Sequence, residues 1–145
     1  MIVNRETVDP RDPASTPVIQ LEWAMGAAIG SIPGARAIHV PRSRFAPVKT
    51  TDDLLVVRSD AYELTSDGQM RPSFDGQEPI VTLDENYYKL LPGFEQRFPA
   101  GPPSLRRCHR FDVEGDVTFG AGVVAVGEVL VTGPRHVPDG EVLGE

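Results

Sequence analysis

The chain has 145 residues, 40% of them hydrophobic, and its 14 Lys and Arg against 21 Asp and Glu give a formal net charge of −7. The length suits one ordinary domain or two small ones. No stretch approaches the roughly 18–20 apolar residues that cross a bilayer, and the single cysteine and scattered histidines exclude a disulfide scaffold and a zinc module. The acidic charge argues against general nucleic-acid binding. Acids and prolines at the N-terminus replace the apolar run of an export signal, so we expect a cytoplasmic protein.

The first forty residues predict a strand, a loop, a helix and a second strand. Residues 2–3 favour a strand, and the DPRDPASTP run after them breaks any regular element. Thr16 as N-cap and Pro17 at the first helical position predict a helix that ends at Gly34. Alternation over 35–40 predicts a strand. The apolar face of that helix comprises Leu21, Met25, Ala28, Ile29 and Ile32.

A loop at 41–48, with prolines near both ends, lies within a local positive stretch. Between Glu22 and Asp52 the sequence has no carboxylate side chain, whereas it has four basic residues, Arg36, Arg42, Arg44 and Lys49. This stretch carries +4 and the remainder −11. A small anion, most commonly phosphate, is the candidate ligand. Solvated surface charge is the alternative interpretation.

A helix is predicted directly after this loop. Thr50 and Asp53 have the spacing of a capping box, and Asp52 and Asp53 fit the charges of a helix start better than a metal-binding pair. Lys49 stands just before the helix, where backbone N–H groups also favour anions. Lys49 is therefore the first candidate for phosphate binding. The predicted apolar face of the helix and its continuation comprises Leu54, Val57, Ala61 and Leu64.

The middle of the chain predicts a connection, a strand and a short amphipathic helix. Residues 65–80 are rich in Gly, Pro, Asp and Ser, and the strand-like IVTLD follows. The segment 85–98 carries large apolar residues that include Tyr87, Tyr88, Leu91, Phe94 and Phe98, and it ends before the GPP at 101–103. Its aromatic side chains fit a hydrophobic core better than a stacking platform.

The last forty residues repeat with a period of six. One apolar series comprises Val113, Phe119, Ala125, Val131, Val137 and Leu143, and a second comprises Leu105, Phe111, Val117, Val123 and Val129. A small-residue series comprises Gly115, Ala121, Gly127 and Gly133. A hexad period is typical of a parallel β-helix, in which three hexads form one coil, apolar residues point to the axis and small residues occupy the corners. About two coils are predicted, and an open coil end would expose strand edges to a partner.

Other catalytic arrangements lack support in the sequence. His39, His109 and His136 are isolated from one another and no nucleophile elbow is present, so a hydrolase triad is not predicted. Cys108 stands among Arg106, Arg107 and Arg110, which predicts a lowered thiol pKa, although an unpaired cysteine of this kind is usually inert.

Four segments resemble the UDP-glucose pyrophosphorylase (UTP–glucose-1-phosphate uridylyltransferase) family of the eukaryotic type. They are IVN at 2–4, VIQLE at 18–22, VPRSRFAPVKTTDDLL at 40–55 and GDVTFG at 115–120, and they occur in the order of that family. The resemblance implies an α/β fold: the tail of a nucleotidyltransferase (Rossmann-like) core followed by a short left-handed parallel β-helix. It divides the chain into core elements at 1–66, a connecting segment with a short helix at 67–103 and the β-helix at 104–145.

The resemblance also implies a reaction. Glucose 1-phosphate attacks the α-phosphorus of UTP with Mg²⁺ assisting, and UDP-glucose and pyrophosphate form. Lys49 would be the catalytic lysine that reaches phosphate oxygens, Arg42 and Arg44 would shape its loop, and the metal ligands would lie elsewhere. The glycine-rich nucleotide loop and the sugar-binding segments of the family have no counterpart in this sequence, so we expect the chain to need an upstream catalytic portion for turnover.

Two alternatives remain open from the sequence. The chain is either part of the enzyme or a non-catalytic assembly module in which the β-helix mediates contacts between subunits, as in a homo-oligomer. A hexapeptide-type acyltransferase shares the period of six, but two coils are too few and no histidine lies in a plausible cleft between subunits.

Overall fold

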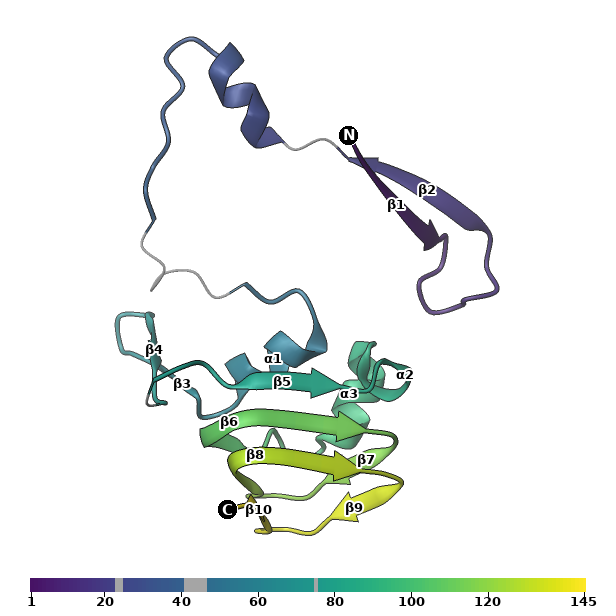
Figure 1. The fold of residues 1–145 in the computed structure, drawn as a ribbon, viewed down its shortest axis with the longest axis vertical. Helices are drawn as coiled ribbons and strands as arrows, with labels where there is room; N and C mark the ends of the chain where they lie inside the picture. Colours follow the sequence, from purple (N-terminus) through teal and green to yellow (C-terminus); the bar gives the residue numbers. More distant parts are fainter. Residues whose placement is uncertain (23–24, 41–46, 75) are drawn as a thin grey trace. The chain divides into compact units, whose positions relative to one another are not determined.

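A computed structural model of the chain describes residues 1–22, 25–40, 47–74 and 76–145. The chain divides into two compact units, Met1–Val40 and Pro41–Glu145 (Figure 1). The loop arginines Arg42 and Arg44 lie outside the described residues.

The first unit is built on an antiparallel hairpin. Strand β1 (Ile2–Thr7) pairs with β2 (Pro17–Glu22) from Ile2 opposite Glu22 to Thr7 opposite Pro17. The prediction of a helix from Thr16 and Pro17 is therefore wrong, because the β-branched residues Val18 and Ile19 of PVIQLE pair with Glu6 and Arg5 of β1. A short 3₁₀ helix, η1 (Met25–Ser31), follows, and the strand predicted at 35–40 is also wrong, since this segment is exposed and has no regular structure.

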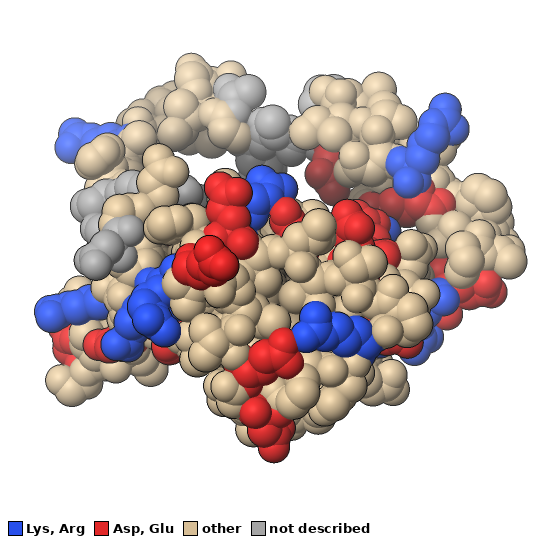
Figure 2. All heavy atoms as spheres, turned by 60° about the horizontal axis from the view of Figure 1, so that its bottom comes forward, with Lys and Arg blue, Asp and Glu red and all other residues tan. Residues whose placement is uncertain are grey.

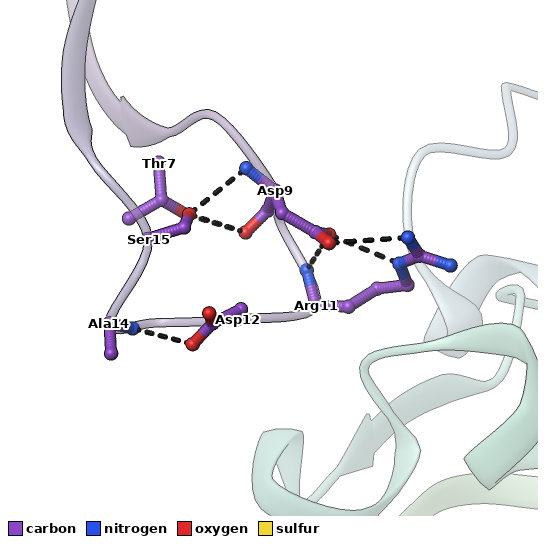
Figure 3. Close-up of polar contacts among 6 residues, drawn as sticks. All are labelled: Thr7, Asp9, Arg11, Asp12, Ala14 and Ser15. Atoms are coloured by element: carbon purple, nitrogen blue, oxygen red, sulfur yellow. Dashed lines mark hydrogen bonds and ion pairs between the residues drawn. The ribbon is translucent and has the colours of Figure 1, made fainter.

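The connection between β1 and β2 is closed by its own polar groups (Figure 3). The backbone N–H of Asp9 donates to Ser15 Oγ at 3.0 Å, and Thr7 Oγ1 donates to the Asp9 carbonyl at 2.9 Å. The Arg11 guanidinium and backbone N–H both donate to the Asp9 carboxylate, which lowers the pKa of Asp9. The predicted loop is confirmed, and Asp9 is its centre.

The second unit contains three α-helices and eight strands among its described residues. In chain order these are α1 (Thr51–Arg58), β3 (Tyr62–Leu64), β4 (Met70–Pro72), β5 (Ile80–Leu83), α2 (Glu85–Tyr88), α3 (Leu91–Arg97), β6 (Ser104–Glu114), β7 (Val117–Phe119), β8 (Val124–Thr132), β9 (Arg135–Val137) and β10 (Val142–Gly144).

Parallel pairing dominates this unit. Strands β10, β8, β6 and β5 form a four-stranded parallel sheet in that order, and β7 pairs in parallel with β9 (Figure 1). Phe111 pairs with Val129, and Phe119 with Val137, so the paired residues are eighteen apart in sequence. Eighteen residues are three hexads. The fold is thus mixed α/β with a parallel sheet.

Both apolar hexad series lie in the hydrophobic core. No member of either series is more than 8% exposed. Two apolar residues outside both series, Leu130 and Val142, are 62% and 59% exposed. The period of six therefore identified the buried side chains correctly.

Gly133 explains why a small residue is required in the third series. A Cβ at this position would lie 2.6 Å from the backbone oxygen of Asp116 in the preceding layer. The two layers are bonded there, because the Gly133 N–H donates to the Glu114 carbonyl at 2.7 Å and the Arg135 N–H donates to the Asp116 carbonyl at 3.0 Å. A larger residue would force the layers apart.

Three of the four aromatic residues of 85–98 complete the core, as the sequence predicted, whereas Tyr87 is 36% exposed. Tyr88, Phe94 and Phe98 are buried, and the Phe98 ring stacks on Phe119 with 5.0 Å between centroids. The Tyr88 hydroxyl donates to the Val117 carbonyl at 2.6 Å. Helices α2 and α3 are therefore joined to β7 by both ring packing and a buried hydrogen bond.

The predicted apolar face of the helix after residue 50 is only partly right. The helix ends at Arg58, and Leu55 and Val56 are its buried residues in place of Leu54 and Val57. Ala61 is buried beyond the helix, while Leu64 is exposed in β3. A helix of two turns buries whichever side meets its neighbour, so spacing alone could not fix the face.

Candidate functional site

Lys49 immediately precedes α1, and its main chain is held by that helix. The Lys49 N–H donates to Asp53 Oδ2 at 2.8 Å. The side chain of Lys49 is exposed, and its ammonium makes no hydrogen bond or ion pair with another described residue. The backbone of the lysine is therefore fixed while its charge stays accessible to an anion.

The capping box predicted for this helix is confirmed. Thr50 is the N-cap: its Oγ1 accepts from the Asp53 N–H at 3.4 Å, and its own N–H donates to Asp53 Oδ2 at 3.0 Å. The bond from the Lys49 N–H, followed by those from Thr50 and by the nearby Lys49 charge, lowers the pKa of Asp53. Asp53 is thus a carboxylate at ordinary pH.

The side chain of Asp52 does not bond the helix cap and instead joins α1 to the parallel sheet. Its Oδ1 accepts from the N–H of Leu83, the last residue of β5, at 3.1 Å. Partial burial is the main reason that the pKa of Asp52 is raised, with the neighbouring charges of Asp53 and Glu85 adding to it. The two carboxylates have separate structural partners.

The hydrogen bonds of Asp52 and Asp53 do not fit a Mg²⁺ site. Oxygens of both Asp52 and Asp53 accept N–H donors, which leaves no converging pair of free carboxylates for a hard cation that needs several oxygen ligands. In the described part of the chain no group of three or more His, Cys, Asp or Glu could hold a metal ion. The helix-start interpretation of Asp52 and Asp53 agrees with these contacts.

Several other basic side chains of the second unit have acidic partners. Arg58 pairs with Glu95 at 2.6 Å, Arg106 with Glu63 at 2.9 Å and Arg97 with Asp116 at 2.9 Å. Figure 2 shows basic and acidic side chains interspersed on the surface, as such pairing requires. Lys49 differs from these arginines because no carboxylate bonds its side-chain cation among the described residues.

The pKa of Cys108 is raised and not lowered, which agrees with the interpretation of this cysteine as inert. The thiol is buried within β6, and burial raises its pKa to about 11. Its Sγ donates to the Arg110 carbonyl at 3.2 Å, whereas the neighbouring arginine side chains are exposed. The three histidines are all exposed and lie in separate segments of the chain.

The sequence analysis missed two carboxylates that join elements of the second unit. Asp60, just after α1, accepts from Ser104 Oγ at 2.7 Å and from the Leu105 N–H at 2.9 Å. Asp84 caps α2 and accepts from the Gly115 N–H at 2.9 Å. The position of Asp84 between a strand and a helix could have revealed its role, but no local signal pairs Asp60 with residues more than forty positions away.

Comparison with known proteins identifies the family. Residues 1–125 match the family model for UTP–glucose-1-phosphate uridylyltransferase. The chain belongs to this family. The resemblance carried by the VPRSRFAPVKTTDDLL block is thereby confirmed.

Relatives in plants and trypanosomatids support this assignment. The uridylyltransferase of Hordeum vulgare is 39% identical over 93% of this chain. A UDP-glucose phosphorylase of Trypanosoma brucei matches 97% of the chain with 45% identity and a TM-score of 0.85. A variant UDP-glucose pyrophosphorylase of Leishmania major, solved in complex with UDP-glucose, matches 98% with 47% identity and a TM-score of 0.79.

The chain spans about a third or less of each relative. It covers 29% of the Hordeum vulgare protein and 31% of each of the two trypanosomatid chains. Within the described residues, no helix is long and apolar enough to span a membrane.

Proposed function

We propose that this chain is the C-terminal part of a UTP–glucose-1-phosphate uridylyltransferase. In the complete enzyme the phosphate of glucose 1-phosphate attacks the α-phosphorus of UTP, the bond from that phosphorus to the bridging oxygen breaks, and pyrophosphate leaves. Catalysis of this kind depends on alignment of the reactants and on neutralising charge at phosphate oxygens. The residues upstream in the longer relatives would supply the rest of the nucleotide and sugar site.

The position of Lys49 is the observation that carries this proposal. The lysine belongs to the VPRSRFAPVKTTDDLL block, its backbone is bonded to the first turn of α1, and its ammonium is exposed. We assign Lys49 the role of neutralising phosphate charge, and Arg42 and Arg44 the role of shaping the same loop. Mg²⁺, which the family implies, would also neutralise phosphate charge. Its ligands would lie outside the described residues of this chain.

The domain plan follows the same proposal. Core elements would occupy 1–66, the connecting segment 67–103 and a left-handed parallel β-helix 104–145. The eighteen-residue register of the parallel strands and the burial of both hexad series support a β-helix.

A non-catalytic assembly module is the second candidate function. Strand β10 lies at the end of the four-stranded sheet, and its Val142 is 59% exposed. An open edge of this kind can pair with another chain, including a second copy of this one.

A graft tests the proposed activity. Residues 1–145 replace the matching segment of the Leishmania major relative, and UDP-glucose formation from UTP and glucose 1-phosphate is measured. We expect the graft to be active and Lys49→Ala to lower kcat/KM by about 100-fold or more, since one lost charge-stabilising donor has an effect of that order. Lys89→Ala is the matched control, because Lys89 is exposed and paired with Glu85, and it should leave the rate within about twofold.

Inactivity of a correctly folded graft would contradict the proposed activity. A cooperative thermal transition establishes folding of the graft. Self-association of the 145-residue chain together with an inactive graft would instead support the assembly module.

A further inference from the structure

Two adjacent carboxylates, Asp52 and Asp53, accept hydrogen bonds from three backbone N–H groups. Two of these groups precede α1 and the third belongs to β5. Asp53 Oδ2 accepts from the Lys49 N–H, the Thr50 N–H and Thr50 Oγ1, at 2.8, 3.0 and 3.2 Å. One oxygen therefore gathers three donors. The backbone of Lys49 is part of the helix cap and is not a free loop end.

The cap is in turn fixed to the parallel sheet. Asp52 accepts from the Leu83 N–H at the end of β5, and Leu55 and Val56 of α1 are buried in the same core as Leu83. A short path thus runs from β5 through Asp52 and Asp53 to Lys49. Movement of α1 relative to the sheet would move the lysine with it.

A negative charge on Asp53, next to a lysine proposed to bind phosphate, requires a structural reason. A carboxylate near a phosphate-binding ammonium repels the phosphate, and the Lys49 charge is close enough to help lower the pKa of Asp53. Its bonds to two backbone N–H groups offset that repulsion by fixing where the lysine stands. Positioning matters because a misplacement of about 1 Å can cost about 100-fold in rate.

We propose that Asp53 is a positioning residue for Lys49, and that Asp52 ties this arrangement to β5. This inference rests on the proposed function of Lys49. Asp53 acts on the reaction through Lys49 and does not itself contact substrate. Replacing Asp53 should therefore lower the reaction rate only while Lys49 is present.

Kinetics of the active graft test this dependence. We expect Asp53→Ala to lower kcat/KM by about 10- to 100-fold, and Asp53→Glu to restore it to within about threefold, because Glu also completes a capping box. In the Lys49→Ala background, Asp53→Ala should change the rate less than twofold. An equal loss in both backgrounds would overturn the inference and assign Asp53 a purely structural role.

Asp84→Ala is the matched control. Asp84 also caps a helix and bonds a distant N–H, that of Gly115, but no candidate site residue adjoins it. We expect the thermal stability of the Asp84→Ala graft to fall as much as that of the Asp53→Ala graft. Its kcat/KM should stay within about twofold of that of the unchanged graft. A similar rate loss in both variants would contradict positioning of Lys49.

Amide exchange in the 145-residue chain tests the geometry independently of activity. The amides of Lys49 and Thr50 should exchange at least about 10-fold more slowly than those of the same chain carrying Asp53→Ala. No change at either amide would overturn the inference, even with an active graft. An inactive graft with protected amides would count against the proposed function alone.

Discussion

Neighbouring side chains of the same type acquire different properties in this chain through their partners. Asp52 and Asp53 are adjacent, yet burial raises the pKa of the first and N–H donors lower that of the second. The difference arises because successive residues at a helix start face different surroundings. The roles of the two carboxylates follow from those partners.

Burial of Cys108 leads to a prediction about its reactivity. With the pKa of the thiol raised to about 11, the thiolate that reacts is about a thousandth of the population at pH 8. We expect the folded chain to react with iodoacetamide at least about 100-fold more slowly at pH 8 than the chain unfolded in urea, and to gain reactivity as pH rises toward 11. Mass spectrometry of the alkylated chain measures both rates, and equal rates would contradict burial of the thiol.

The surroundings of Cys108 could not be predicted from its neighbours in sequence. Arginines at 106, 107 and 110 surround the cysteine in sequence, but β6 has register shifts on both sides of the cysteine, between Ser104 and Arg107 and between Cys108 and Arg110, which interrupt the regular alternation of faces. In β6 the cysteine points into the core and the arginines point out. The Thr50–Asp53 capping box was predictable because all its bonds lie within four residues.

Elements with a strong internal period were predictable, and elements that depend on a distant partner were not. The hexad series identified apolar residues that are buried in and between β6 and β10, since parallel strands paired eighteen residues apart place every third hexad in the same register. Strand β2 was predicted as a helix because its spacing fits both structures, and only pairing with β1 decides between them. The strand predicted at 35–40 lacks such a partner among the described residues.

The junction between α2 and β7 provides a prediction at the scale of elements. Tyr88→Phe keeps the buried ring but leaves the Val117 carbonyl without its 2.6 Å hydroxyl donor. We expect the free energy of unfolding in urea to fall by about 1–3 kcal/mol. Tyr87→Phe is the control, because the Tyr87 hydroxyl has no bond with another described residue, and it should change stability by less than about 0.5 kcal/mol. Equal effects would contradict a stabilising role for the bond.

The two units of the molecule differ in how much apolar surface they cover. In the second unit, parallel strands, α1 and the aromatic residues of α2 and α3 enclose one core. In the first, every residue of β2 is exposed, including Ile19 at 57% and Leu21 at 56%. An isolated two-stranded hairpin is marginally stable in water.

Hydrogen exchange measures the difference in local stability between the two units. In the 145-residue chain we expect the paired amides of β8 to exchange at least about 100-fold more slowly than those of β2, because opening β8 exposes the core while opening the hairpin exposes little more than is already exposed. In the graft the rest of the enzyme should cover the hairpin, so the amides of β2 should slow by about 10-fold or more while those of β8 stay unchanged. Protection of β2 equal to that of β8 in the chain alone would mean that the first unit is stable without additional polypeptide. Unchanged exchange of β2 in an active graft would mean that the enzyme functions with the hairpin open to solvent.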